Sequence, residues 1–227
     1  MAPTDRYRSP ADLPEQIPVF PLRGVILLPR AVLPLSIYEP RYLTMLEDVI
    51  AGERIIGIVQ PERVEGDEES PSGKSVSLRT VGCAGRLTAF QELEDDRVLI
   101  TLTGISRFGL GAEVATDKPY RNFKVVYDRY GEDFQAGAGE EIVDRTNLLR
   151  VLKSYLEAHK LKADWRAILN APSEYLVNSL SVVCPYGPEE KQALLEAQDL
   201  KTRAEVLMAL AEMELASSES GSGGAMN

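Results

Sequence analysis

The Gly-Lys pair at positions 73 and 74, in "SPSGKS", is the part of this sequence that comes nearest to a phosphate-binding loop. Such a loop needs another glycine five positions before Gly73 and a helix after the pair, because the helix N-terminus faces the phosphates. The earlier position holds Glu68, and the strand-like "VSLRTVG" follows. The pattern therefore argues against an ATP site, and Lys74 is expected in an exposed loop.

The same loop carries five acidic residues: Glu62, Glu65, Asp67, Glu68 and Glu69. A calcium site needs oxygen ligands at alternating positions around a glycine turn, and "EGDEES" does not have that spacing. Runs of like charge are usually solvated. We therefore predict a solvated acidic loop and no metal site.

His159 is the only histidine, and Cys83 and Cys184 are the only cysteines. These residues are too few for zinc ligation at the usual spacing. His159 follows a helical pattern in "EAHK", where a partly cationic ring suits the helix dipole, so we predict a capping role and no catalytic base. The cysteines lie in apolar surroundings and are predicted to be buried, reduced thiols of a cytoplasmic protein, with a single disulfide as the alternative.

No catalytic residue and no cofactor site is predicted. The glycines of "GISRFGLG" do not follow the G-x-G-x-x-G order and open no helix, so they indicate a bend. Spacing alone does not exclude a catalytic Ser-Lys dyad, although no residue indicates one. Trp165 is predicted to be a packing anchor, with a recognition role as the alternative.

The elements that would position any site begin with "VFPLRGVILLPRAVLPLSIYEPRY", residues 19 to 42. Pro21, Pro29 and Pro34 exclude a helix, because proline removes a backbone donor and is tolerated in strands only at edges, starts and bulges. We predict two short, edge-tolerant strands. Pro40 then suits the first position of a helix, with Gly52 as its C-terminal cap.

Strands dominate the first 130 residues and helical periodicity dominates the rest, which predicts an α+β chain of two lobes. The expected parts are a disordered N-terminus at 1–15, a β-rich lobe at 16–130, a linker at 131–139, a helical lobe at 140–216 and a flexible tail at 217–227.

The net charge is −10, with 25 basic and 35 acidic residues. Nucleic-acid binding needs clustered cations that displace counterions from phosphates, so no nucleic-acid partner is expected. The N-terminus has no apolar signal region and no apolar run reaches the length of a membrane span, so no membrane partner is expected either.

Three blocks resemble the N-terminal, substrate-binding domain of the Lon protease family. They are "IPVFPLRGVILLPRAVLPLSIYEPRYLTMLEDVIAGERIIGIVQ", "VGCAGRLTAFQELEDDRVLITLTGISRFGL" and the helical end that starts at "APSEYLVNSL", and the resemblance covers about residues 15 to 216. It implies an N-terminal PUA-like pseudo-β-barrel with one covering helix, followed by a C-terminal helical bundle. It does not carry over ATP hydrolysis or peptide cleavage, since no match to those modules is present. Glu39 and Arg41 are expected to form a structural ion pair or cap.

The leading hypothesis is a non-enzymatic recognition module for exposed apolar segments of client polypeptides in protein quality control. Clients would add a strand to a barrel edge or lie in a groove between the lobes. Val25, Ile26, Leu27 and Leu28 are the candidate contacts, with burial in the core as their alternative. The rival hypotheses are an adaptor that docks a folded partner protein and a small-molecule-binding or enzymatic reuse of the fold. The oligomeric state stays open.

Overall fold

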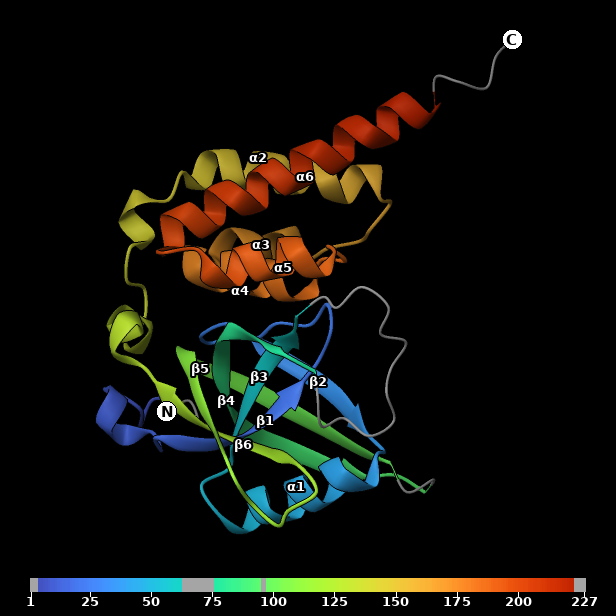
Figure 1. The fold of residues 1–227 in the computed structure, drawn as a ribbon. Coiled ribbons are helices and arrows are strands. Elements are labelled where there is room, and N and C mark those ends of the chain that lie inside the picture. The colour runs from blue at the N-terminus through green and yellow to red at the C-terminus, as the bar shows by residue number, and fades with distance from the viewer. Residues whose placement is uncertain (1–3, 63–75, 95–96, 223–227) are drawn as a thin grey trace.

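The computed structural model describes residues 4–62, 76–94 and 97–222. Its strands are β1 (Gln16–Pro21), β2 (Val32–Ile37), β3 (Ile55–Pro61), β4 (Leu78–Glu92), β5 (Val98–Val114) and β6 (Arg121–Val126). Its α-helices are α1 (Pro40–Ala51), α2 (Arg145–Ala158), α3 (Trp165–Asn170), α4 (Ser173–Val183), α5 (Pro188–Glu196) and α6 (Leu200–Ser222). Strands precede helices, as expected. Helices α2 to α6 form a lobe stacked on one end of the sheet, and α1 lies at the opposite end (Figure 1).

The six strands form one sheet in the order β2-β5-β4-β3-β1-β6. Because β6 also pairs with β5, five strands close into a ring of hydrogen-bonded neighbours. Strand β2 stays outside this ring and pairs only with the first half of β5. The structure is thus a mixed α+β fold, whereas kinship with PUA folds stays a prediction.

The proline-containing strands tolerate their prolines in the predicted way. Residues Gln16–Val19 of β1 pair with β6, and residues Val19–Pro21 pair with β3, so only Val19 has a partner on both sides. Strand β2 is an edge along its whole length. Each proline of β1 and β2 therefore has a neighbouring strand on one side only, so its missing N–H group does not have to bond to a second strand.

Helix α1 begins and ends where the sequence predicted. Pro40 stands at its first position and Gly52 follows its last residue, with the Gly52 N–H donating to the Asp48 and Val49 carbonyls. Its apolar stripe of Tyr42, Met45, Leu46 and Val49 is buried. The helix therefore covers the barrel end with one face.

Three of the expected boundaries need correction. Residues 4–15 are not disordered, because Tyr7 and Leu13 are buried in a core cluster with barrel residues. The expected linker at 131–139 overlaps the 3-10 helix η2 (Asp128–Phe134), which buries Asp133. The helical lobe starts with the short η3 (Glu140–Ile142) before α2. Helix α6 continues to Ser222, beyond the expected end at 216.

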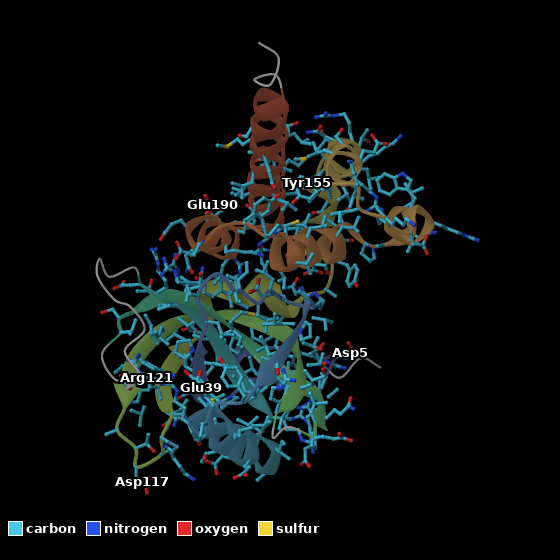
Figure 2. The ribbon with its side chains drawn as sticks, turned by 90° about the vertical axis from the view of Figure 1, so that its right-hand side faces the viewer. Asp5, Glu39, Asp117, Arg121, Tyr155 and Glu190 are labelled. Carbon is cyan, nitrogen blue, oxygen red and sulfur yellow. The ribbon has the colours of Figure 1, made fainter. Side chains whose placement is uncertain are left out.

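The main hydrophobic core runs through both lobes. It joins barrel residues such as Ile56 and Leu102 to helical residues such as Val177, Leu194 and Leu207. Figure 2 shows side chains filling the space between the lobes. Among the described residues, none of the helices is both long and apolar enough to span a bilayer.

Candidate functional site

The predicted contact residues 25–28 lie inside the protein. Ile26, Leu27 and Leu28 expose at most 1% of their surface, and Val25 is half-buried against the same core. The prediction that they form an exposed contact is therefore corrected in favour of its core alternative. A docking surface for a polypeptide, if the chain has one, would be sought elsewhere.

Close backbone packing explains why this segment is buried. A Cβ atom on Gly104 of β5 would lie 1.9 Å from the Leu28 carbonyl oxygen, and one on Gly85 of β4 would lie 2.5 Å from Leu27 Cδ2. Two glycines thus let the segment lie directly on the strands. It closes the end of the barrel that faces the helical lobe.

Polar side chains hold this closed end against the helices. Asn178 of α4 donates to the Pro29 carbonyl at 3.0 Å, and Arg30 pairs with Glu174 of α4. Gln60 of β3 donates to the Pro188 carbonyl at 2.9 Å. A client segment would have to break these bonds to lie between the lobes, so the inter-lobe route is not available in this structure.

The most buried ion pair also belongs to this junction. Arg107 of β5 forms two-pronged hydrogen bonds with Asp133, and its Nη1 donates to the Leu195 and Ala197 carbonyls. Burial alone would lower the pKa of the Arg107 guanidinium. The hydrogen bonds and the negative charge of Asp133 have the larger effect and raise this pKa. Nearby, burial lowers the pKa of Arg203 to about 10. Both arginines bond to main-chain carbonyls of the helical lobe, so their role is structural.

The residues that could have supported catalysis are placed unfavourably for it. Cys83 and Cys184 are free and buried, as predicted, and burial raises the pKa of both thiols, so they stay protonated near neutral pH. His159 follows α2, where its Nδ1 donates to the Tyr155 carbonyl and its Nε2 lies 3.1 Å from Glu214. This matches the predicted capping role.

Other predicted features have mixed outcomes. Arg41 Nε donates to Glu39 at 2.9 Å, which confirms the structural ion pair. Trp165 is half-buried at the start of α3 and is not among the buried core residues.

The Gly-Lys pair and the acidic loop at 63–75 lie outside the described residues. Within the described ranges, no group of three or more His, Cys, Asp or Glu could hold a metal ion.

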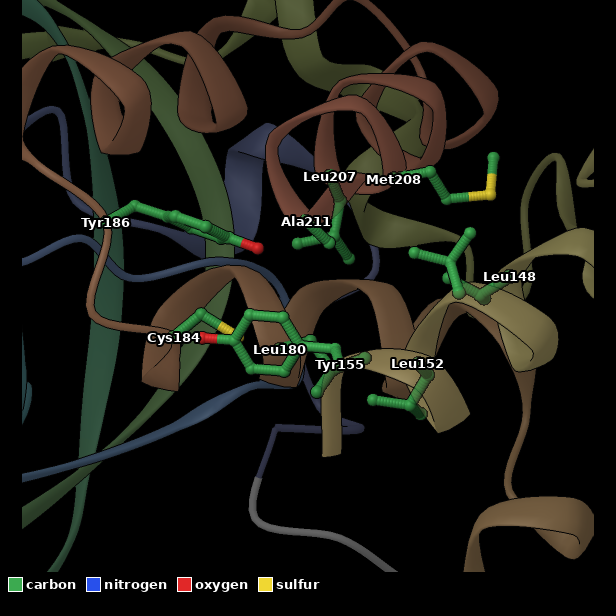
Figure 3. A pocket seen from close by; sticks show the side chains of 10 residues that line it. Leu148, Leu152, Tyr155, Leu180, Cys184, Tyr186, Leu207, Met208 and Ala211 are labelled. Atoms are coloured by element: carbon green, nitrogen blue, oxygen red, sulfur yellow. The ribbon is translucent and has the colours of Figure 1, made fainter. Parts of the chain in front are cut away.

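An apolar cavity of about 20 Å³ lies between α2, α4 and α6 (Figure 3). Leu152, Tyr155, Leu180, Tyr186 and Ala211 are among its lining residues. Its volume is that of about one water molecule, which is too small for a client side chain. Burial raises the pKa of Tyr155 to about 12, so its hydroxyl is no base at neutral pH.

A larger cavity of about 160 Å³ lies beside the start of β1, the end of α1 and Tyr120. Its acidic group Asp48 already binds Lys118 and Tyr120, and these hydrogen bonds lower the pKa of the carboxyl. The cavity has room for one side chain, but the charged residues at its rim do not favour the binding of an apolar segment.

The outward face of β2, β5 and β4 is the surface that best fits a polypeptide. Alternate residues of β2 point outward, and the exposed Val32, Pro34, Ser36 and Tyr38 follow this alternation. In register beside them, Thr103, Thr101 and Leu99 of β5 lie opposite Val32, Pro34 and Ser36. Ala89 and Gln91 of β4 continue the rows. We call these nine residues the outer face.

None of the nine residues of the outer face is acidic or basic, although 26% of the chain is charged, and Arg86 of β4, opposite Thr103, borders the face. Tyr38, Val32 and Leu99 are 66%, 47% and 42% exposed. Grouped exposed apolar side chains on a water-soluble surface mark interaction sites. Sequence reasoning missed these residues, although the alternation in "AVLPLSIY" was a signal that could have identified them.

The main chain at the free edge of β2 is interrupted. The Gly104 N–H donates to the Ala31 carbonyl, and the Gly104 carbonyl accepts from the Arg30 N–H, so the ladder begins with an irregular hydrogen-bonded position at Ala31 and Gly104. Hydrogen-bonded pairs alternate along an antiparallel ladder, which places Pro34, opposite Thr101, at a non-hydrogen-bonded pair. The Pro34 nitrogen therefore faces the free edge without a donor, a feature that opposes strand addition. Side-chain contact with the outer face is the better route.

Comparisons with known proteins identify the family of the chain. Residues 16–212 match the family profile of the ATP-dependent protease La (LON) substrate-binding domain. Lon protease 2 of Myxococcus xanthus is 26% identical over 202 residues, and the Lon protease of Flavobacterium johnsoniae is 28% identical over 201 residues. The matches cover 88% and 85% of this chain but only 24% and 23% of those proteases.

Two solved structures share the fold. A Lon N-terminal domain protein from Xanthomonas campestris aligns with a TM-score of 0.58 at 21% identity, covering 86% of this chain and 97% of that one. The N-terminal domain of the Mycobacterium avium complex Lon protease aligns with a TM-score of 0.62 at 17% identity, covering 87% and 98%. The family profile extends over most of the sequence, as the resemblance predicted. The chain therefore belongs to the family of the Lon protease substrate-binding domain.

Proposed function

We propose that this chain is a recognition module without catalytic activity of its own, which binds exposed apolar segments of client polypeptides in protein quality control. The observation that carries the proposal is the outer face, where exposed apolar side chains of neighbouring strands share one surface that has no acidic residue among its nine members, in a protein of net charge −10. The family to which the chain belongs is described by substrate binding, which supports the same function.

Binding through the outer face would allow a broad set of clients. Tyr38, Val32 and Leu99 offer apolar surface with few directional groups, so they favour hydrophobic segments without selecting a sequence. A folded protein buries most such segments and an unfolded one exposes them. The free thiols of Cys83 and Cys184 further support work in a reducing compartment such as the cytoplasm.

The affinity for any one segment is expected to be modest. The surface is small, and an unfolded client loses conformational freedom when it binds. We expect a Kd of about 10 to 100 μM, which corresponds to roughly 5 to 7 kcal/mol. Such weak contacts allow a client to be sampled and released.

The proposal is tested by fluorescence anisotropy with a labelled, permanently unfolded protein and with its folded form. Saturable binding of the unfolded form alone is the expected result. Failure to bind either form would overturn the proposal and leave the docking of a specific folded partner as the surviving hypothesis. Equal binding of both forms would also contradict the proposal, because the protein would then not distinguish exposed apolar segments from buried ones.

A further inference from the structure

Charge is distributed unevenly over the chain. Residues 145–170 contain six Lys and Arg against two acids, whereas the whole chain has a net charge of −10. At the end of this stretch, Lys160, Leu161, Lys162, Arg166 and Leu169 are all exposed. We call these five residues the basic corner. It lies where α2 ends and the chain turns into α3, away from the outer face.

The cations of the basic corner differ from the exposed cations of α2. Arg150 pairs with Glu212 at 2.8 Å, and Lys153 lies 3.9 Å from Glu157. The side chains of Lys160, Lys162 and Arg166 form no ion pair with any described residue. These three positive charges thus have no ion-pair partner among the described residues, on a protein whose net charge is strongly negative.

Apolar side chains are exposed among these cations. Leu161 is 55% exposed and Leu169 is 59% exposed. The acid nearest in sequence, Asp164, already accepts a hydrogen bond from the Ala167 N–H at the start of α3. The corner therefore offers positive charge and apolar contact side by side.

The backbone at the end of α2 departs from what helix stability alone would favour. The Leu161 N–H donates to the Leu156 carbonyl and the Lys160 N–H to the Glu157 carbonyl, a Schellman arrangement in which glycine normally takes the Lys160 position. Lys160 has a φ of 52°, in the left-handed region that is unfavourable for residues with a Cβ. Leu161, which usually packs back onto the helix in this motif, is instead more than half exposed.

We propose that the basic corner is a second binding surface, specific for acidic polypeptide segments that carry an apolar side chain. The uncommitted cations would bind carboxylates, and Leu161 and Leu169 would contact the apolar side chain. A nucleic acid or an anionic membrane fits less well, because the corner is small and the rest of the protein would repel a large polyanion. The surface goes beyond the proposed function, since it selects clients or partners by charge.

The probe is a fluorescein-labelled peptide of twelve residues, made of Glu and Asp with one central Phe, measured by anisotropy at low ionic strength. Three comparison probes are the same peptide with Ser for Phe, the same peptide with Lys for its acids, and a twelve-residue single-stranded oligothymidylate. We expect the acidic Phe peptide to bind at least tenfold more tightly than each of them. Its affinity should fall with added salt, because salt screens exposed charges.

A triple variant, Lys160→Gly, Lys162→Gln and Arg166→Gln, tests the site itself. A single exposed ion pair contributes little, but losing three together should weaken peptide binding about tenfold or more. Lys124→Gln, which removes an exposed cation of β6, is the matched control and should change the affinity less than twofold. Lys160→Gly alone should weaken binding without lowering the Tm, because glycine relieves the left-handed backbone.

Unchanged peptide binding in the triple variant would overturn the assignment, and so would equal or tighter binding of the oligothymidylate. The test is independent of the outer face, because Tyr38→Ser with Leu99→Thr should leave the acidic peptide's Kd within twofold. If that double variant abolishes binding of the acidic peptide, the basic corner is not its site.

Discussion

At the residue scale, the contact between Gly104 and Leu28 decides how the barrel is closed. The backbone of residues 25–28 lies so near β5 that only a residue without a side chain fits. The same contact removes Ile26, Leu27 and Leu28 from the surface. Gly104, together with Gly85, thus determines that this apolar segment is core, whereas the outer face is available for binding.

Gly104→Ala should lower the free energy of unfolding by about 3 kcal/mol, because the new Cβ forces the Leu28 backbone away from the strand. Urea denaturation followed by circular dichroism measures the change. Gly131→Ala is the control, since a Cβ there meets no atom within 4 Å. Equal stability of the two variants would show that residues 25–28 do not pack on β5 as described.

Asp199 shows how a single carboxylate stabilises the helix that closes the fold. It accepts a hydrogen bond from the Thr202 N–H at 2.7 Å before α6, and this bond, followed by one from the Thr202 hydroxyl, lowers the pKa of the carboxyl. A lowered folded-state pKa means that the unfolded chain binds the proton more readily. The stabilisation is therefore complete above the unfolded-state pKa and is lost as the pH falls through the folded-state pKa.

Asp199→Ala should cost about 1 kcal/mol of stability at pH 7, the usual effect of losing a helix N-cap. The difference from the unchanged protein should shrink as the pH falls below the unfolded-state pKa and through the lowered folded-state pKa of Asp199, because the carboxylate is then protonated in both states. Urea denaturation at pH 7 and at about pH 2, well below the usual aspartate pKa, measures it. A difference that is as large at the acidic pH as at pH 7 would contradict the electrostatic account of this cap.

At the element scale, the sequence predicts local structure better than it predicts which elements meet. The proline pattern identified two edge-tolerant strands, and Pro40 and Gly52 marked both ends of α1, because these preferences act within a few residues. The burial of residues 25–28 depends on Gly85 and Gly104, which lie far away in the sequence. No local pattern could reveal that contact.

The outer face was only partly predictable for the same reason. The alternation of Val32, Pro34, Ser36 and Tyr38 is visible in the sequence, but the rows from β5 and β4 depend on strand register. The bulge between Leu87 and Ala89 shifts that register by one residue. A surface assembled from three strands needs the tertiary structure to be seen.

The pairing of β5 with η2 through Arg107 and Asp133 is expected to dominate the junction of the lobes. Asp133→Asn would leave Arg107 buried without a countercharge, which typically costs about 3 to 5 kcal/mol. Glu212→Gln, which breaks the exposed pair with Arg150, should cost less than about 0.5 kcal/mol. Similar losses in the two variants, measured by urea denaturation, would show that the buried pair does not hold the lobes together.

At the scale of the whole molecule, the two lobes form one structural unit. One hydrophobic core extends from the barrel into the helices, and polar side chains bridge the junction. The outer face and the basic corner therefore lie on a single rigid body. A client that contacts both would be held at a fixed spacing, which adds effective concentration to two weak contacts.

This continuity predicts that the chain unfolds in one cooperative step. Differential scanning calorimetry should show a single transition whose calorimetric enthalpy equals the van't Hoff enthalpy. Separate barrel and helix domains would unfold independently, because few contacts would join them. Two resolved transitions, or a calorimetric enthalpy well above the van't Hoff value, would contradict a shared core.

The most direct test of the central claim compares two double variants in binding to a labelled, permanently unfolded protein. Tyr38→Ser with Leu99→Thr removes apolar surface from the outer face, and Val183→Ser with Met213→Ser removes comparably exposed side chains, each 67% exposed, from α4 and α6. The account predicts that the first variant binds about tenfold more weakly, since about 1.4 kcal/mol of apolar contact is lost, while the second binds like the unchanged protein. Equal affinities for all three proteins would show that the outer face does not recognise clients.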